Sequence, residues 1–110
     1  MSDTNLDHQE TVTEDAIRAI LSGVLDPEVG ENIIDLGLIY GVEIQAHQVK
    51  INLTMTSAAC PMGEMLLENI HDALVRDLPP TYDFELHLVW EPPWEPEMMS
   101  VAAKQRLGWH

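Results

Sequence analysis

Basic side chains are scarce in this sequence. Five Lys and Arg stand against 19 Asp and Glu, which gives a formal net charge of −14 over 110 residues. Binding to a nucleic-acid backbone or to an anionic membrane surface requires clustered positive side chains, because the affinity comes largely from neutralising phosphates. We therefore expect no nucleic-acid partner and no membrane partner.

Long apolar runs are also missing. No stretch approaches the roughly 20 apolar residues of a membrane-spanning helix, and no basic segment precedes an apolar one near the N-terminus. A chain of 110 residues is near the usual size of one domain. We expect a single-domain protein located in the cytoplasm.

Cysteine occurs once, as Cys60. One cysteine forms no internal disulfide, which fits a reducing compartment. A zinc or iron–sulfur centre usually takes four protein ligands, so one thiol is too few to hold such a centre alone. Any cluster at Cys60 must therefore share ligands with a second copy of the chain, a free thiol or a partner protein.

Hydrophobic periodicity predicts six elements. Their order is helix, strand, strand, helix, strand, helix, at about 14–24, 38–45, 49–56, 61–77, 82–90 and 97–107. This order predicts a two-layer α+β domain over residues 13–110, with a small mixed or antiparallel sheet of about three strands covered by helices on its apolar face. Residues 1–12 are polar and acidic, and we expect them to form a flexible tail.

The same periodicity predicts which side chains each element buries. The second strand is expected to bury Val49, Ile51, Leu53 and Met55. Its outer face is expected to carry Lys50, Asn52, Thr54 and Thr56. The third strand is expected to bury Tyr82, Phe84, Leu86, Leu88 and Trp90. The predicted stripe of the second helix is Met62, Met65, Leu66, Asn69, Ile70, Ala73 and Leu74, and that of the last helix is Met98, Met99, Ala102 and Leu107, with Gly108 as its C-cap.

Cys60 directly precedes Pro61, which is typical of the first position of a helix. Backbone N–H groups and the helix dipole lower the pKa of a thiol there, which favours a metal ligand, a cluster ligand or a nucleophile. A small buried residue filling the helix corner is the alternative. His71 lies roughly 16 Å further along the same helix, too far to pair with Cys60 locally. The other four histidines fall in the tails, in the hairpin loop or on the outer face of the third strand, so no Cys–His dyad is visible.

Two other segments are candidates for function. Asp26 and Glu28 flank Pro27 and could supply carboxylate ligands, although Asp26 could equally cap the turn that follows the first helix. Trp94, within the proline-rich stretch EPPWEP, could anchor a partner protein or pack the last helix onto the sheet.

Three segments carry characteristic motifs in a fixed order. They are LDPEVGENIIDLGLIYGV at 25–42, LTMTSAACPMGEML at 53–66 and LVWEPPWEPEMMSVAAKQRLGW at 88–109. Together they resemble the MIP18 family, which includes SufT-like and PaaD-like proteins. The resemblance covers about residues 14–109 and implies an iron–sulfur cluster assembly domain, in agreement with the predicted element order.

The resemblance implies a SufT-like assembly and maturation factor that assists delivery or insertion of iron–sulfur clusters into client proteins, and not a catalyst. Cys60 would be the functional thiol and a metal or cluster ligand, with Asp26, Glu28, Thr54 and Thr56 lining the site. No cofactor is expected to be bound stably, and iron or an iron–sulfur cluster would be held transiently. The implied partners are the assembly machinery and client apoproteins, with a homodimer left open.

Two alternatives belong to other classes. One is a PaaD-like accessory subunit of a phenylacetate-degrading oxygenase complex, for which we would expect further C-terminal cysteines. The other is a thiol enzyme with Cys60 as nucleophile, which needs a depressed thiol pKa and a nearby base.

Overall fold

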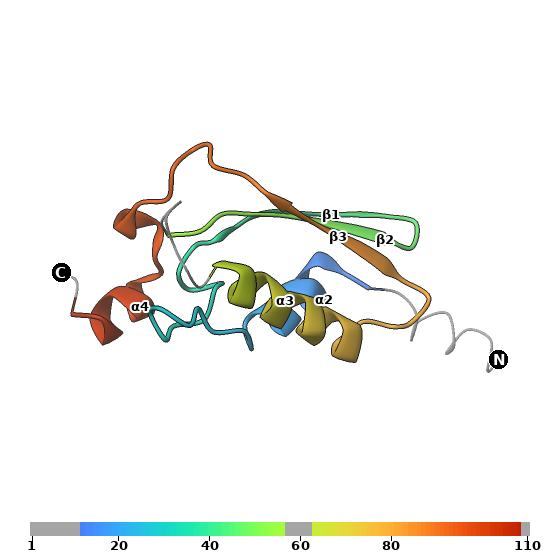
Figure 1. Ribbon diagram of the computed structural model, residues 1–110, viewed down its shortest axis with the longest axis horizontal. Helices are drawn as coiled ribbons and strands as arrows, with labels where there is room; N and C mark the ends of the chain where they lie inside the picture. The colour runs from blue at the N-terminus through green and yellow to red at the C-terminus, as the bar shows by residue number, and fades with distance from the viewer. Residues whose placement is uncertain (1–11, 57–62, 109–110) are drawn as a thin grey trace.

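The computed structural model describes residues 12–56 and 63–108 and contains the predicted order of elements (Figure 1). The elements are α2 (Glu14–Leu21), β1 (Ile39–Gln45), β2 (Gln48–Leu53), α3 (Gly63–Asp77), β3 (Asp83–Leu88), the short 3-10 helix η1 (Pro96–Met98) and α4 (Val101–Arg106). No helix within these two described ranges is long and apolar enough to cross a membrane. The predicted α+β class is confirmed.

The three strands form one mixed sheet with β2 in the centre. β1 pairs antiparallel with β2 through the two-residue turn Ala46–His47, whereas β3 runs parallel to β2. A parallel neighbour requires a crossover connection, and α3 forms part of it. In Figure 1, α2 and α3 lie against one face of the sheet and pack against each other.

The core lies between this face and the two helices. The alternation predicted for β2 is confirmed, because Val49, Ile51 and Leu53 are fully buried. Thr13 caps α2 by accepting the Ala16 N–H at 3.1 Å. The helices contribute fully or nearly fully buried side chains, namely Ile17, Leu21, Leu66, Ile70, Ala73 and Leu74. Each large apolar side chain buried here contributes roughly 1.5–3 kcal/mol to folding.

Several predicted element ends and faces were wrong. The first helix ends at Leu21 rather than near residue 24, because Ser22 already caps it. On α3, Met65 and Asn69 are exposed, so the buried stripe is narrower than predicted. On β3, Leu88 is 38% exposed, and Trp90 lies beyond the strand and is 42% exposed. β3 is an edge strand, so side chains at its end have neighbours on fewer sides than those of β2.

The predicted last helix is split into η1 and α4. Met99 is extended, and the Ser100 side chain then accepts the Ala103 N–H at 3.1 Å, which starts a new helix. The split changes which side chains are buried. Met99 and Ala103 are buried, whereas Met98, Ala102 and Leu107 are exposed. Gly108 has φ +78°, as expected of a residue that ends a helix.

The C-terminal segment, residues 89–108, is fastened to residues 31–40. The indole N–H of Trp94 donates to the Leu36 carbonyl at 2.7 Å, and Trp94 packs half-buried against the core. The Tyr40 hydroxyl donates to the Pro92 carbonyl at 2.8 Å. These bonds explain why the proline-rich stretch keeps a defined path without regular secondary structure. A docking role for Trp94 stays a prediction.

The two segments approach each other closely at Gly37. Its φ is +77°, and a Cβ atom there would lie 2.4 Å from the Met98 carbonyl oxygen. No side chain fits in that space, so the C-terminal segment depends on glycine at this position.

Gly37→Ala is therefore expected to destabilise the protein more than Gly30→Ala. Both glycines have positive φ, +77° and +80°, but a Cβ at Gly30 would meet nothing within 4 Å. Urea unfolding should give a loss of about 1 kcal/mol for Gly30→Ala, from backbone strain alone, and about 3 kcal/mol for Gly37→Ala. Equal losses would mean that the contact with Met98 does not constrain the fold.

Candidate functional site

The Asp26 carboxylate organises a tight turn after the first helix. Asp26 is 2% exposed, and its Oδ1 accepts the Glu28 N–H at 2.8 Å. Its backbone carbonyl accepts the Gly30 N–H at 2.7 Å, and its own N–H donates to the Glu31 carbonyl at 2.9 Å. This is the side-chain-to-backbone pattern that aspartate favours in turns. The turn presents a buried carboxylate at Asp26 and an exposed residue, Glu28, two positions later.

The two threonines differ in burial, contrary to the prediction that both face outward. β2 ends at Leu53, and the next residue, Thr54, is fully buried while Thr56 is half-buried. The Thr54 N–H donates to the Leu38 carbonyl at 2.9 Å. Met55 is also buried, at 7% exposure, so the alternation of the strand stops here.

Met55 lies beneath the first residue of α3. A Cβ on Gly63 would come within 2.7 Å of the Met55 sulfur, so the end of β2 and the start of α3 are packed closely together. Cys60 lies outside the described residues, as does Pro61. The position of the thiol at a helix N-terminus therefore stays a prediction. The structure defines the packing of Met55 before this segment and of Gly63 after it.

The Thr54 hydroxyl is the unusual atom of this region. Its Oγ1 is buried and makes no hydrogen bond with any described residue. The nearby Tyr40 hydroxyl is engaged elsewhere, by the Pro92 carbonyl. Burial is the main cause that raises the pKa of Tyr40, and the charge of Glu95 adds to it, while the nearby Thr54 hydroxyl lowers it. The Thr54 and Tyr40 hydroxyls are close together but do not form a hydrogen bond. A buried hydroxyl without a partner costs roughly 1–3 kcal/mol.

A series of backbone hydrogen bonds connects Thr54 with the Asp26 turn. Leu38, which accepts from Thr54, donates to the Ile33 carbonyl at 3.1 Å. Ile33 in turn donates to the Val24 carbonyl at 3.0 Å, two residues before Asp26. These backbone bonds link the segment before the Asp26 turn to the residue after β2, and a shared site for Asp26, Glu28, Thr54 and Thr56 stays a prediction.

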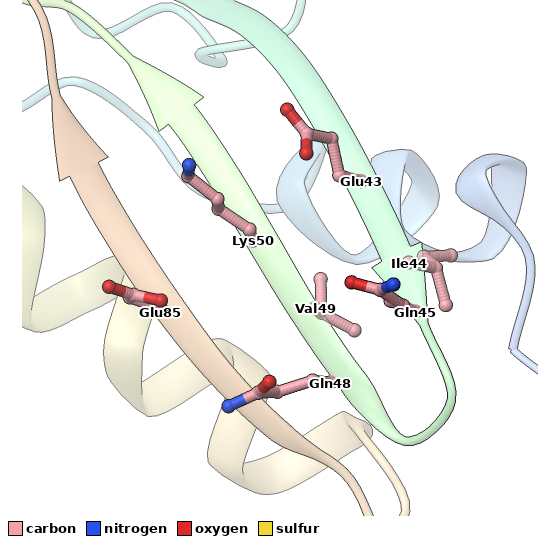
Figure 2. Close-up of a pocket in the computed structure, with 7 residues that line it drawn as sticks. All are labelled: Glu43, Ile44, Gln45, Gln48, Val49, Lys50 and Glu85. Carbon is pink, nitrogen blue, oxygen red and sulfur yellow. The ribbon is translucent and has the colours of Figure 1, made fainter.

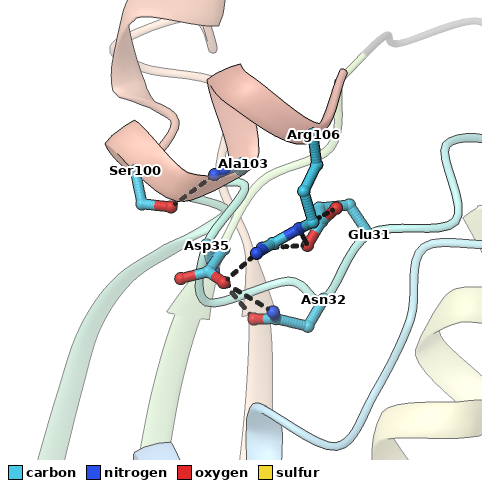
Figure 3. Close-up of polar contacts among 6 residues, drawn as sticks. All are labelled: Glu31, Asn32, Asp35, Ser100, Ala103 and Arg106. Carbon is cyan, nitrogen blue, oxygen red and sulfur yellow. Dashed lines mark hydrogen bonds and ion pairs between the residues drawn. The ribbon is translucent and has the colours of Figure 1, made fainter. Parts of the chain in front are cut away.

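An ion-pair cluster that the sequence analysis missed holds this region to the C-terminus (Figure 3). Arg106 Nε donates to both carboxylate oxygens of Glu31, at 2.9 and 3.0 Å. Arg106 Nη2 donates to Asp35 Oδ2 at 2.9 Å, and Asn32 Nδ2 donates to the same oxygen at 2.8 Å. Since the Glu31 carbonyl closes the Asp26 turn, Arg106 fixes the residue on which that turn depends.

These contacts lower the pKa values of both acids. For Glu31 the main cause is the hydrogen bond from Arg106. For Asp35 it is the hydrogen bond from Asn32, with Arg106 and Ser100 adding to it, while burial opposes the effect in both cases. The sequence contains one sign of this ion-pair cluster, since Arg106 is one of five Lys and Arg residues in an acidic chain.

Arg106→Gln is expected to lower the melting temperature at pH 7 and to lose that effect in acid. A carboxylate whose folded pKa is lowered stabilises the protein above its unfolded pKa, and this contribution is lost as the pH falls through the folded pKa. With ordinary values of 4.5 for Glu31 and 3.8 for Asp35, the gap to wild type should close as the pH falls below 4.5. Lys104→Gln, on the same helix, is the control and should show a small gap that does not change with pH. An Arg106→Gln gap that stays constant down to pH 3 would contradict this account.

A hollow of about 430 Å³ lies at the opposite end of β2, near the β1–β2 turn (Figure 2). It is lined by Glu43, Ile44, Gln45, Gln48, Val49, Lys50 and Glu85. Lys50 is in register with Glu43 on β1 and with Glu85 on β3, so opposite charges face each other across the strands. None of the predicted site residues lines this hollow, so we do not assign the function to it.

The part of the chain that the structure describes contains no ligand set for a resident metal centre. No group of three or more His, Cys, Asp or Glu side chains lies close enough together there to hold a metal ion.

Fold and motifs together define a small α+β domain with one cysteine-bearing segment between a strand and a helix. Residues 14–85 match the model of the iron–sulfur cluster assembly protein family. The chain belongs to this family, and the resemblance indicated by its motifs is confirmed.

Curated relatives and solved structures agree with this assignment. The Fe-S protein maturation auxiliary factor YitW of Bacillus subtilis (strain 168) is 39% identical over 100 residues, which is 90% of this chain and 97% of that protein. The Fe-S protein maturation auxiliary factor SufT of Staphylococcus aureus (strain USA300) is 41% identical over 86 residues, 77% of this chain and 97% of that protein. A crystal structure of a domain of unknown function from Bacillus anthracis superposes with a TM-score of 0.79 at 37% identity, covering 86% of this chain and 91% of that chain.

Proposed function

We propose that this protein is an auxiliary factor in the maturation of iron–sulfur proteins, acting in the cytoplasm through the thiol of Cys60. Iron or a cluster is its cargo, held briefly while it passes to a client apoprotein. Family membership and the auxiliary factors named among its relatives support this role. They favour an accessory factor over a thiol enzyme or a subunit of an oxygenase complex.

The observation that carries the proposal is the buried hydroxyl of Thr54, which has no hydrogen-bond partner among the residues that the structure describes. It is fully buried at the end of β2, six residues before Cys60. Burying such a hydroxyl lowers the stability of the folded protein. It is best explained as a hydrogen-bonding group that serves the cysteine-bearing segment or its cargo. We propose that Thr54 donates to the anionic sulfur or to a ligand on the metal.

The shortage of ligands explains why the holding is brief. Cys60 supplies one thiolate, and we propose that the Asp26 turn contributes carboxylate oxygens. An iron site built this way keeps coordination positions open for a ligand from the donor or the client. Incomplete coordination is what a delivery factor needs, because a complete ligand set would retain the cluster.

Cys60→Ser is expected to abolish the maturation function while leaving the fold unchanged. Serine keeps the size of the side chain but lacks the soft thiolate that binds iron. The test is the activity of an iron–sulfur enzyme in cells that lack the native protein and carry either variant. Full rescue by Cys60→Ser, at equal protein levels, would overturn the proposal.

Thr54→Val and Thr54→Ser separate a functional hydroxyl from a structural one. Valine removes the unpartnered hydroxyl at constant size, so Thr54→Val should raise the free energy of unfolding by about 1 kcal/mol and lower maturation activity. Thr54→Ser keeps the hydroxyl and should retain most activity despite a loss of about 1 kcal/mol from the missing methyl group. A Thr54→Val protein that is stabilised and fully active would refute the role of this hydroxyl.

A further inference from the structure

The outer edge of β3 is unpaired in the part of the chain that the structure describes. The Asp83 N–H donates to the His47 carbonyl and the Val89 N–H to the Leu53 carbonyl, both at 2.8 Å, so these odd-numbered residues point toward β2. Successive residues of a strand direct their backbone groups to opposite sides. The N–H and C=O groups that point away from β2 therefore belong to Phe84, Leu86 and Leu88.

The side chains along this edge form two rows of different chemistry. Phe84, Leu86 and Leu88 share the face that the helices cover, and the last of them is 38% exposed. Phe84 lies at a hollow of about 230 Å³ lined by Leu74, Val75, Leu78, Pro79, Pro80, Tyr82 and Phe84. On the opposite face, Glu85 and His87 lie two residues apart, with Nε2 and Oε2 at 2.6 Å.

We propose that a second copy of this chain pairs with the edge, β3 against β3, antiparallel and centred on Leu86. The Leu86 residues of the two copies then lie opposite each other. Phe84 lies opposite the partner's Leu88, and Glu85 lies opposite the partner's His87. The three outward-pointing residues of each copy meet as hydrogen-bonded pairs, which gives about six main-chain hydrogen bonds.

Neighbouring registers are unfavourable. Centring the pair on Phe84 would place Asp83 opposite the partner's Glu85, a carboxylate against a carboxylate. Centring it on Leu88 would place Glu85 opposite the partner's Glu91. It would also place Phe84 opposite the partner's Pro92, which has no N–H to donate. Of these three registers, only the one centred on Leu86 places a carboxylate opposite a histidine on one face of the sheet. The same register places apolar side chains opposite each other on the other face.

The edge is self-complementary, which is why we assign a second copy rather than a different protein. The twofold axis generates the Glu85–His87 pair twice, and it sets the exposed Leu88 beside Phe84, at the rim of the apolar hollow. The net charge of −14 on each chain opposes association, but at about 0.15 M salt this long-range repulsion is screened beyond roughly 8 Å.

Sedimentation equilibrium of charge variants tests the pairing. Wild type should dimerise, and His87→Glu, which sets a second carboxylate side by side with the partner's Glu85, should raise the dissociation constant at least about tenfold. The double variant Glu85→Lys/His87→Glu again places a basic side chain opposite a carboxylate and should restore the dimer. Gln45→Glu adds the same charge at the β1 edge and should change nothing. A wild type that stays monomeric up to about 0.5 mM, or a dimer insensitive to His87→Glu, would overturn the proposal.

Disulfide trapping tests the register itself. In a Cys60→Ser background, Glu85→Cys and His87→Cys proteins are mixed and oxidised. The two positions face each other in a pair about 4.5 Å apart at Cα, within disulfide range. The mixture should cross-link several times faster than either protein alone. Equal cross-linking in the mixture and in the separate proteins would rule out the register centred on Leu86.

Discussion

The ion pair of Arg106 with Glu31 and Asp35 is the interaction on which the candidate site depends. It joins residues more than 70 positions apart and holds α4 against the loop that leads into β1. Glu31 also closes the Asp26 turn through its backbone carbonyl, so one guanidinium fixes both the C-terminal helix and the turn. Trp94, which donates to the Leu36 carbonyl, and Gly37, which lies against Met98, also join the C-terminal segment to the residues that lead into β1. The buried side chains of Ile33, Leu36 and Leu38 and the backbone bonds of Ile33 and Leu38 hold the same segment from the side of the core.

The cysteine-bearing segment begins and ends on rigid parts of this framework. Thr54 and Met55 are buried at its start, and Gly63 packs on Met55 at its end. A functional thiol needs fixed surroundings if it is to receive and release a metal in a defined orientation. The Thr54 hydroxyl is buried without a hydrogen-bond partner among the described residues, and local departures from good packing of this kind are expected at functional sites.

Sequence reasoning succeeded where local pattern decides structure. The element order and the buried face of β2 follow from apolar spacing, and the Asp26 turn follows from the aspartate before Pro27. It failed where a long-range contact overrides local pattern. Thr54 continues the polar alternation of β2 but is fully buried, and its N–H donates to the distant Leu38 carbonyl. The partners of Arg106 carry no periodic signature, and the split of the last helix depends on Ser100, whose N–H donates to the distant Asp35 carbonyl.

In the proposed function, Cys60 holds iron with a ligand set that this chain cannot complete alone. The most direct measurement is native mass spectrometry after anaerobic reconstitution with iron and sulfide, with and without an added low-molecular-weight thiol. Iron is expected on the wild-type protein mainly when the added thiol is present, and none above background on Cys60→Ser. Equal iron on wild type and Cys60→Ser would contradict it.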